Sequence, residues 1–462
     1  MPGSCSAAGA APRLVSLQAC AGAGHRLCDF ANLEVVAHLT RGIEALGGLP
    51  QSRQRDEQEL MLQVALVAPL WATRGFGSVE AERAARRAVE LSRQGGTDTP
   101  AHFRALYGLA YAHLIRGDLR GARPLAEQML DLAERLKDPE LLGYAHFEMG
   151  CELLWSAELA AARRHLEQGI AVYDPEWGRS AASRYAFNCG SNCHSFLGRV
   201  LWHLGYPDEA LRHAGQAIAL AQEVFHTFSQ GVARNWTTEL LQLRGEIERA
   251  RDMAEDLLGF ATEQGFPFLA ARARGIGGWA LVRQGQPEEG IAQMRAGLLA
   301  YRATGAELES SHWLGLLAEA SCDAGCAKEG LRTVAEALDH IGQTGIVYYE
   351  PELHRLRGEL LLRSDPADAL QAEACFHRAL EIARRQQAKS WELRAATSLA
   401  RLWGDCGRGE EARQLLAPVY DWFTEGFDTA DLQDTKALLA DLAQALRPQF
   451  LSLALSVNGR IR

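Results

Sequence analysis

The stretch LGYPDEALRHAGQAIAL, residues 204–220, determines the fold because closely related phrases return along the chain. RGEIERARDMAEDLLGF follows at 244–260 and QGQPEEGIAQMRAGLLA at 284–300. Each phrase has a glycine at its second position, a small residue five positions later, and then apolar residues at helical spacing. Glycine suits the left-handed end of a helix, and Pro207 and Pro287 suit the first turn of the next helix. Each phrase therefore predicts the turn of a helical hairpin.

The hairpins recur with a period near 40 residues. The small residue that opens each second helix falls at regular steps of 40, interrupted by one step of 48 and one of 42, at Ala122, Ala162, Ala210, Ala250, Gly290, Gly330, Ala372 and Ala412. Matching positions in the preceding helices, 12 residues earlier (14 before Ala372), are Ala110, Gly150, Gly198, Thr238, Gly278, Ala318, Gly358 and Ala400. Small side chains at both positions mark where two helices approach most closely, so a fixed period of such pairs indicates a helical repeat array.

We therefore predict an all-α, right-handed superhelical solenoid of antiparallel hairpins, similar to tetratricopeptide (TPR) repeats but with a period of about 40 residues. Residues 1–28 are expected to be disordered, or to result from a translation start site that has been placed too early. Helical repeats are expected over 29–97, eight hairpins over 98–425, a capping helix over 426–447 and a tail over 448–462.

Composition excludes several classes of function. The formal net charge of −10 argues against sequence-independent binding of nucleic acid, which requires neutralisation of phosphates. No apolar run reaches the ~20 residues that span a bilayer. The ten cysteines form no regular framework, which favours a reducing cytoplasmic compartment.

No catalytic motif is recognisable. None of the four lysines follows a glycine, as the P-loop requires, and the Gly-x-Ser-x-Gly and His-Glu-x-x-His patterns are absent from the sequence. We expect neither catalysis nor a cofactor. The best metal candidate is the group Cys189, Cys193 and His194, but a structural zinc site needs a fourth ligand, so packing is the favoured interpretation. The sequence leaves metal binding there open.

Several phrases resemble a known family. HRLRGELLL at 354–362, FHRALEIARRQQAKSWELRAATSLARLW at 376–403 and WFTEGFDTADL at 422–432 are the most specific. Together with the repeats, they make residues 31–446 similar to the C-terminal repeat region of bacterial proteins that join a class III adenylate/guanylate cyclase domain, a P-loop ATPase domain and TPR-like repeats. The resemblance implies a regulatory role in cyclase/ATPase signalling. NCGSNC, residues 188–193, departs from the Asp-Pro-Gly that relatives tend to carry before a cysteine.

The first helices of the hairpins are expected to line a concave groove. With the small residue as register mark, the groove-facing candidates are Asn192, Arg199, Trp202, Asn235, Glu239, Arg272, Trp279, Arg283, His312 and Glu319. Arginine, tryptophan and asparagine suit a protein or peptide partner. We therefore predict a non-enzymatic interaction or sensor module, and the family resemblance implies a cyclase or ATPase as its partner. The alternatives are a solenoid that senses a small ligand and a fragment of a cyclase–ATPase protein. The sequence does not determine the oligomeric state.

Overall fold

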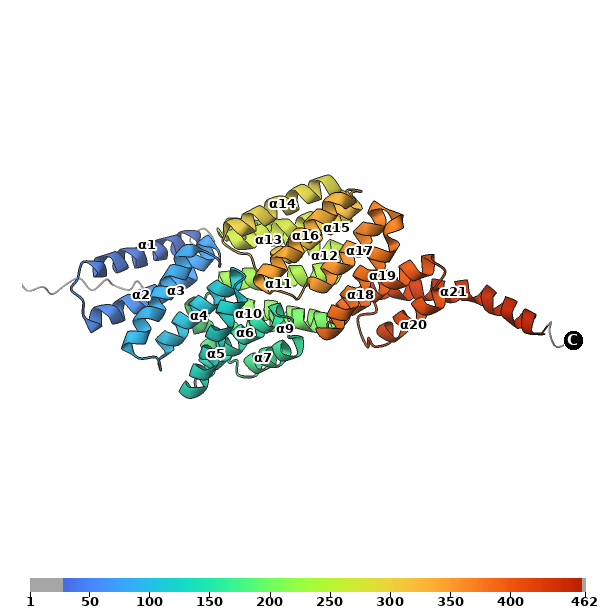
Figure 1. Cartoon of the computed structure of the whole chain (residues 1–462). Helices are drawn as coiled ribbons and strands as arrows, with labels where there is room; N and C mark the ends of the chain where they lie inside the picture. Colours follow the sequence, from blue (N-terminus) through green and yellow to red (C-terminus); the bar gives the residue numbers. More distant parts are fainter. Residues whose placement is uncertain (1–27, 459–462) are drawn as a thin grey trace, which may run out of the picture.

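The computed structural model describes residues 28–458, and every regular element in this range is helical. Residues 1–27, which contain nearly all of the segment predicted to be disordered, lie outside the described residues. The array begins with α1 (Cys28–Gly47), α2 (Arg53–Arg74) and α3 (Val79–Gly95). No helix in the described range is both long and apolar enough to cross a bilayer. The predicted helical solenoid is confirmed (Figure 1).

Pairs of adjacent antiparallel helices follow one another along the chain. They are α4 (Pro100–Ile115) with α5 (Leu119–Leu136), α6 (Pro139–Trp155) with α7 (Leu159–Ala171), α9 (Cys189–Leu204) with α10 (Pro207–Glu223), α11 (Thr227–Leu243) with α12 (Ile247–Glu263), α13 (Pro267–Arg283) with α14 (Pro287–Ala303), α15 (Ser310–Asp323) with α16 (Ala327–Thr344), α17 (Glu350–Ser364) with α18 (Ala369–Arg385), and α19 (Lys389–Asp405) with α20 (Gly409–Tyr420).

The turns and close approaches follow the chemistry expected from the sequence. Gly205 ends α9 at a φ of 93°, and its N–H donates to the carbonyl groups of Leu201 and Trp202. A Cβ added at Gly278 would lie 2.6 Å from the carbonyl oxygen of Gly290, and the reverse substitution would bring a Cβ within 2.5 Å of the Gly278 oxygen. Because backbone meets backbone there, no larger residue fits without separating α13 from α14.

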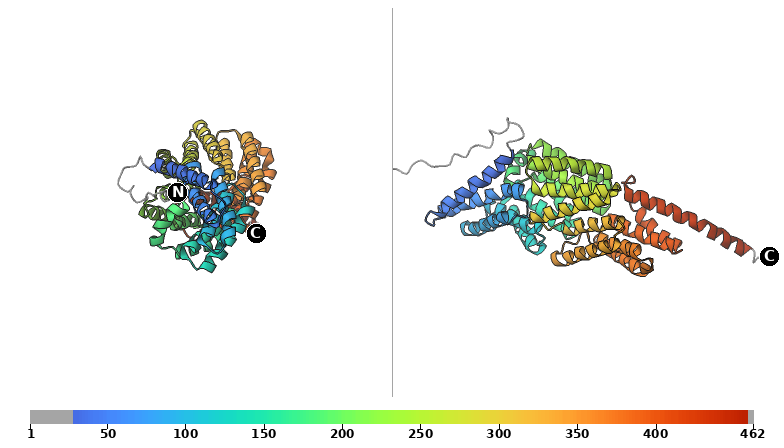
Figure 2. Two further views of the ribbon diagram at one scale, coloured as in Figure 1. Left: turned by 90° about the vertical axis from the view of Figure 1, so that its left-hand side faces the viewer. Right: turned by 90° about the horizontal axis from the view of Figure 1, so that it is seen from above.

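The two irregular steps of the period correspond to inserted elements. α8 (Pro175–Tyr185) lies within the 48-residue step, and the short 3-10 helix η2 (Pro366–Asp368) lies within the 42-residue step. The final helix, α21 (Ala430–Asn458), continues past residue 447, the expected end of the capping helix, and extends away from the body of the protein (Figures 1 and 2).

Successive turns of the superhelix are joined by hydrogen bonds. The carbonyl oxygen of Ile115 accepts from the N–H groups of Glu307 (2.9 Å) and Leu308 (3.0 Å), and that of Trp155 accepts from Val347 N–H (3.1 Å). The Ser390 hydroxyl donates to the carbonyl of Trp202 at 2.5 Å. These carbonyl groups belong to last turns of helices, where the helix itself leaves them unpaired. Each partner lies five hairpins further along the chain, so one superhelical turn comprises five hairpins.

The centre of the superhelix is filled by side chains. Phe76, between α2 and α3, packs against rings from hairpins far along the chain: its ring centroid lies 5.5 Å from that of Phe228 and 5.0 Å from that of Phe268. Phe187 adds a third ring at 6.2 Å. Among the first helices of the hairpins, α4, α9 and α11 are buried on nearly all sides. The inner face of the solenoid is therefore a packed axis, around which the helices are arranged in the end-on view (Figure 2).

A candidate site at the axis

Four consecutive hairpins bring charged side chains to one point on this axis. Arg199 comes from α9, Glu239 from α11, Arg272 from α13, His312 from α15, and Glu309 from the position just before α15. We call these five residues the axial cluster. Each exposes at most 2% of its surface. Charged groups are almost never buried to this degree unless they are paired, so the cluster differs from ordinary solenoid core.

The two guanidinium groups share the two carboxylates. Arg199 Nη2 lies 2.5 Å from Glu239 Oε1 and 3.2 Å from Glu309 Oε1. Arg272 forms ion pairs with both Glu239 and Glu309. Its Nε also donates to Asn235 Oδ1 at 2.7 Å. Two positive charges thus face two carboxylates, which is the pairing that a buried charge requires.

Aromatic rings enclose the guanidinium groups. Arg199 Cζ lies 4.5 Å from the ring centroid of Trp155 and 4.7 Å from that of Trp236. Arg272 Cζ lies 4.5 Å from the same Trp236 ring. The electron-rich faces of indole rings attract cations, and the attraction grows when water is excluded. Trp236 therefore stacks with both arginines and fixes their separation.

The ionisation states follow from these contacts. Burial raises the pKa of Glu239, but the charges of Arg199 and Arg272 outweigh burial, and the resulting pKa lies below its ordinary value. Burial lowers the pKa of His312 to about 4 despite the nearby Glu239. His312 is therefore neutral at pH 7, and its Nε2 lies 3.2 Å from Gln242 Oε1.

Several donors at the axis have no acceptor among the described residues. They are Arg199 Nε and Nη1, Asn235 Nδ2 and Tyr348 Oη. Tyr348 belongs to the segment between α16 and α17, and its ring centroid lies 4.8 Å from that of Trp155. A buried donor without an acceptor costs ~1–3 kcal/mol. The axis therefore has a surplus of hydrogen-bond donors, which favours an acceptor-rich group.

Glu239, Glu309 and His312 also have the spacing of metal ligands in the described part of the chain. The same carboxylates already pair with Arg199 and Arg272. A divalent cation held by those oxygens would lie beside two guanidinium groups, with like charges in close contact. The donor set therefore fits an anion binder better than a metal site.

The structure brings half of the predicted inner-face residues together. Arg199, Asn235, Glu239, Arg272 and His312 meet at the axis, where they are buried rather than facing an open groove. Large side chains that meet at the axis fill the space where the groove was expected.

The other five inner-face residues lie apart. Trp202 is buried against Trp391, with ring centroids 4.8 Å apart. Asn192 and Trp279 are buried, whereas Arg283 is exposed and pairs loosely, at 4.0 Å, with the half-buried Glu319.

Cys189 and Cys193 are buried, with Sγ atoms 3.9 Å apart. The His194 imidazole instead pairs with His213, and their Nδ1 atoms are 2.7 Å apart. The ligand atoms of Cys189, Cys193 and His194 form no group with metal-binding spacing among the described residues. Asn188, from the same NCGSNC segment, caps α9 by accepting from Ser191 N–H at 2.8 Å.

Sequence reasoning missed Glu309, Trp155, Trp236 and Tyr348. Glu309 precedes α15 and Tyr348 precedes α17, so neither occupies a helical register position that the repeat could mark. Trp155 and Trp236 lie on first helices, but indole rings at such positions are more often core than site. For Trp155 and Trp236, the only signal in the sequence was the position of their helices in the 40-residue repeat.

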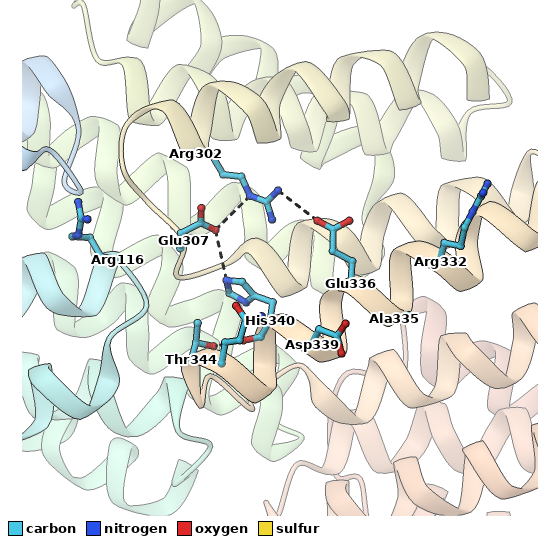
Figure 3. Close-up of a pocket in the computed structure, with 10 residues that line it drawn as sticks. Arg116, Arg302, Glu307, Arg332, Ala335, Glu336, Asp339, His340 and Thr344 are labelled. Carbon is cyan, nitrogen blue, oxygen red and sulfur yellow. Dashed lines mark hydrogen bonds and ion pairs between the residues drawn. The ribbon is translucent and has the colours of Figure 1, made fainter.

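A hollow of about 770 Å³ lies outside the axial cluster, at the junction of two superhelical turns (Figure 3). Arg116 comes from the first of these turns, and Arg302, Glu307 and His340 come from the second. Glu307 Oε2 lies 3.4 Å from Arg302 Nε and 3.6 Å from His340 Nε2. The hollow is polar and open to solvent, and Glu307 in its lining lies two positions before Glu309 in the sequence.

Comparison with known proteins supports the fold. No protein-family model matches the chain. A curated relative, an uncharacterized protein of Rhizobium meliloti, is 24% identical over 391 residues, which cover 82% of this chain and 36% of that protein. The chain thus spans about a third of the length of that relative.

Solved structures show a similar architecture. A Rap protein complexed with competence and sporulation factor has a TM-score of 0.55 and 12% identity, and the match covers 83% of this chain and 99% of that one. A signal-transduction ATPase with a tetratricopeptide repeat sensor from Pyrococcus horikoshii matches at a TM-score of 0.37 and 14% identity, over 78% of this chain and 55% of that one. The likeness to the Rap protein defines the chain as a TPR-like helical-repeat solenoid, and the looser match adds nothing to this conclusion.

Proposed function

We propose that the chain is a non-enzymatic regulatory module that binds a protein or peptide partner and changes between a closed and an opened superhelix. The observation that carries this proposal is the closure itself. Hairpins five repeats apart meet through hydrogen bonds, such as those from Glu307 and Leu308 to Ile115, and through a few ring contacts, such as Trp202 with Trp391. Behind these bonds lies a charged cluster rather than a wholly apolar core. Separating the turns exposes groups that water or a partner can solvate, so opening costs less than exposing apolar core.

In the opened form, the ten predicted inner-face residues become the partner-binding surface. Arg199, Arg272 and Trp202 are of the types that dominate binding energy in protein interfaces. A small ligand at the axis is a second candidate, favoured by the unpaired donors of Arg199, Asn235 and Tyr348. In both cases the chain recognises a ligand and carries out no reaction.

We further propose that the module acts in the cytoplasm of a bacterium within a cyclase- or ATPase-linked signalling system, either as part of a longer protein or as a separate partner. The resemblance of residues 354–362, 376–403 and 422–432 to the repeat region of such proteins supports this proposal. The greater length of the curated relative is consistent with a longer signalling protein.

A reversible lock tests the role of opening. A Cβ at Gly117 would lie 3.7 Å from Glu307 Cβ, a separation suited to a disulfide. The full chain carrying Gly117→Cys and Glu307→Cys can be purified gently from its native cell and studied by native mass spectrometry. We expect a stoichiometric partner with the wild type and with the reduced variant, and its loss on oxidation.

The two single-cysteine variants control for the substitutions themselves, including the φ of 81° at Gly117. A partner that stays bound to the oxidised double variant would contradict opening. Recovery of the wild-type chain alone would contradict the interaction module.

A further inference from the structure

We propose that the axial cluster is a binding site for a carboxylate-bearing ligand and that Glu309 is the internal carboxylate which this ligand replaces. The inference rests on the proposed function, because it names the chemistry that the inner face recognises. The two arginines, Glu239 and Trp236 form a cage whose present occupant, Glu309, is itself a carboxylate. Planar guanidinium groups match carboxylates in geometry as well as in charge.

The two acidic residues of the cage are anchored differently. Glu239 lies within α11, one turn before its end, and this helix is buried on nearly all sides. Glu309 lies in the connection between α14 and α15, immediately before the first helical residue, Ser310. The Glu309 carbonyl accepts from Trp313 N–H at 3.0 Å, so moving this segment disturbs only the first turn of α15 and leaves the rest of the helix folded. Glu309 is therefore the carboxylate that a ligand can displace, whereas Glu239 is part of the fixed cage.

Polar contacts connect Ser310, the residue next to Glu309, to the solvent-exposed hollow. The Ser310 hydroxyl donates to Glu307 Oε2 at 2.6 Å, and Arg302 Nε donates to the same hydroxyl at 3.3 Å. Arg302 and Glu307 both line the open hollow at the junction of the superhelical turns (Figure 3). A ligand that enters this hollow meets the segment carrying Glu309 before it meets the cage.

Displacement of Glu309 also acts on the closure of the superhelix. The same segment supplies the Glu307 and Leu308 N–H groups that pair with Ile115. Its Gly305 packs so tightly on Gly77 that a Cβ on Gly77 would lie 2.3 Å from the Gly305 carbonyl carbon. Moving Glu309 out of the cage strains these contacts, so carboxylate binding is coupled to opening.

The unpaired donors are consistent with a ligand richer in acceptors than Glu309. Arg199 Nε and Nη1 and Asn235 Nδ2 have no partner among the described residues while Glu309 occupies the cage. A carboxylate accepts about four hydrogen bonds. A ligand with a further acceptor beside its carboxylate, such as a peptide terminus with its amide carbonyl, would satisfy these donors.

The first test is replacement of Glu309 in the full chain. Glu309→Ala leaves two guanidinium groups with one carboxylate and frees the volume of the lost side chain. We expect acetate to occupy it: for a dissociation constant of about 10 mM, about 100 mM acetate lowers the unfolding constant roughly tenfold relative to equal chloride. Glu307→Ala, in the same segment but outside the cage, is the matched control and should show no acetate effect.

If Glu309→Ala does not fold in chloride, recovery of its helical circular dichroism by acetate, and not by chloride, supports the same conclusion. Equal behaviour in acetate and chloride, whether folded or unfolded, would overturn the proposal. The isosteric Glu309→Gln variant then shows whether the cage still folds when only the charge is removed.

The second test uses wild-type chain and distinguishes a free small acid from a peptide terminus. Trialanine with a free carboxylate is compared with trialanine amide and with acetate, while hydrogen exchange is followed at Glu307 and Leu308. Faster exchange with the free peptide alone supports a peptide terminus, and faster exchange with acetate also supports a small acid. Unchanged exchange with all three would overturn displacement of Glu309. If these tests contradict carboxylate binding, but oxidation of the Gly117→Cys/Glu307→Cys variant still releases a partner, only the carboxylate inference is refuted.

Discussion

Replacing Arg272 by methionine tests whether the axial cluster is held by its charges. Methionine keeps the apolar stem of the side chain and removes its guanidinium group. The variant loses the ion pairs with Glu239 and Glu309 and the 2.7 Å hydrogen bond to Asn235. Arg199 is then the single guanidinium that faces two buried carboxylates within the cluster.

The expected cost is large. Removing one partner of a buried ion pair leaves an uncompensated charge and destabilises a protein by about 3–5 kcal/mol. Domains are stable by only about 5–15 kcal/mol. We therefore expect Arg272→Met to lose a large part of the stability of the hairpins around the axis.

The pH dependence identifies the cause. In the wild type, the pKa of Glu239 is lowered, so its contribution is present above its ordinary pKa of about 4.5 and is lost as the pH falls further. Without Arg272, burial prevails and the pKa of Glu239 rises, so protonation relieves the unpaired charge. The difference in stability between wild type and variant should shrink from pH 7 to pH 5, whereas a packing defect would not depend on pH.

Urea unfolding followed by circular dichroism at both pH values measures this difference. Arg274→Met, at an exposed position on the same helix, is the control and should change stability by less than about 0.5 kcal/mol. A loss below about 1 kcal/mol for Arg272→Met, or an equal loss at pH 7 and pH 5, would refute the charge argument.

Three further predictions test other features of the fold, the last by comparing two glycine substitutions. Burial lowers the pKa of His203 to about 3. Because the unfolded chain then binds this proton more readily, His203 destabilises the fold as the pH falls below about 6.5. His203→Phe should therefore reduce the pH slope of the unfolding free energy between about pH 6.5 and 4.5 by about 1.4 kcal/mol per pH unit. Burial raises the pKa of Glu148 to about 8, so Glu148→Gln should stabilise the protein at pH 7 by up to about 3 kcal/mol and by much less at pH 5, as measured by urea unfolding. Gly278→Ala should cost about 1–3 kcal/mol in thermal unfolding because its Cβ meets the backbone of Gly290, whereas Gly259→Ala, with open space around it, should stabilise α12 by about 0.5–1 kcal/mol.

The sequence was sufficient to predict the hairpins because their determinants are local. A glycine at the turn and a small residue at the crossing point recur at a fixed spacing, and both act within one hairpin. Closure of the superhelix is different. It depends on the angle between successive hairpins, which accumulates over five repeats before Ile115 meets Glu307. A small change in that angle per repeat separates an open groove from a packed axis, and the period contains no measure of it.

The same distinction explains which site residues were found. Arg199 and Glu239 are 40 residues apart at equivalent positions, so the register placed both on the inner face, and the structure brings them into contact. Glu309 joins them from a connection between helices, where the register has no meaning. Its role depends on the closure that the period could not predict.

The composition of the axis bears on why it is charged at all. Phe76 and Phe187 show that part of this axis is closed by aromatic rings. Replacing buried ion pairs by apolar side chains is often neutral or stabilising, so Arg199, Arg272 and their carboxylates add little that further rings could not supply. For the proposed function, the charges limit the free energy needed to open the closed state, and they define which chemical groups can bind at the axis. An apolar axis would make a stable rod, whereas a charged axis suits the opening and closing that we propose.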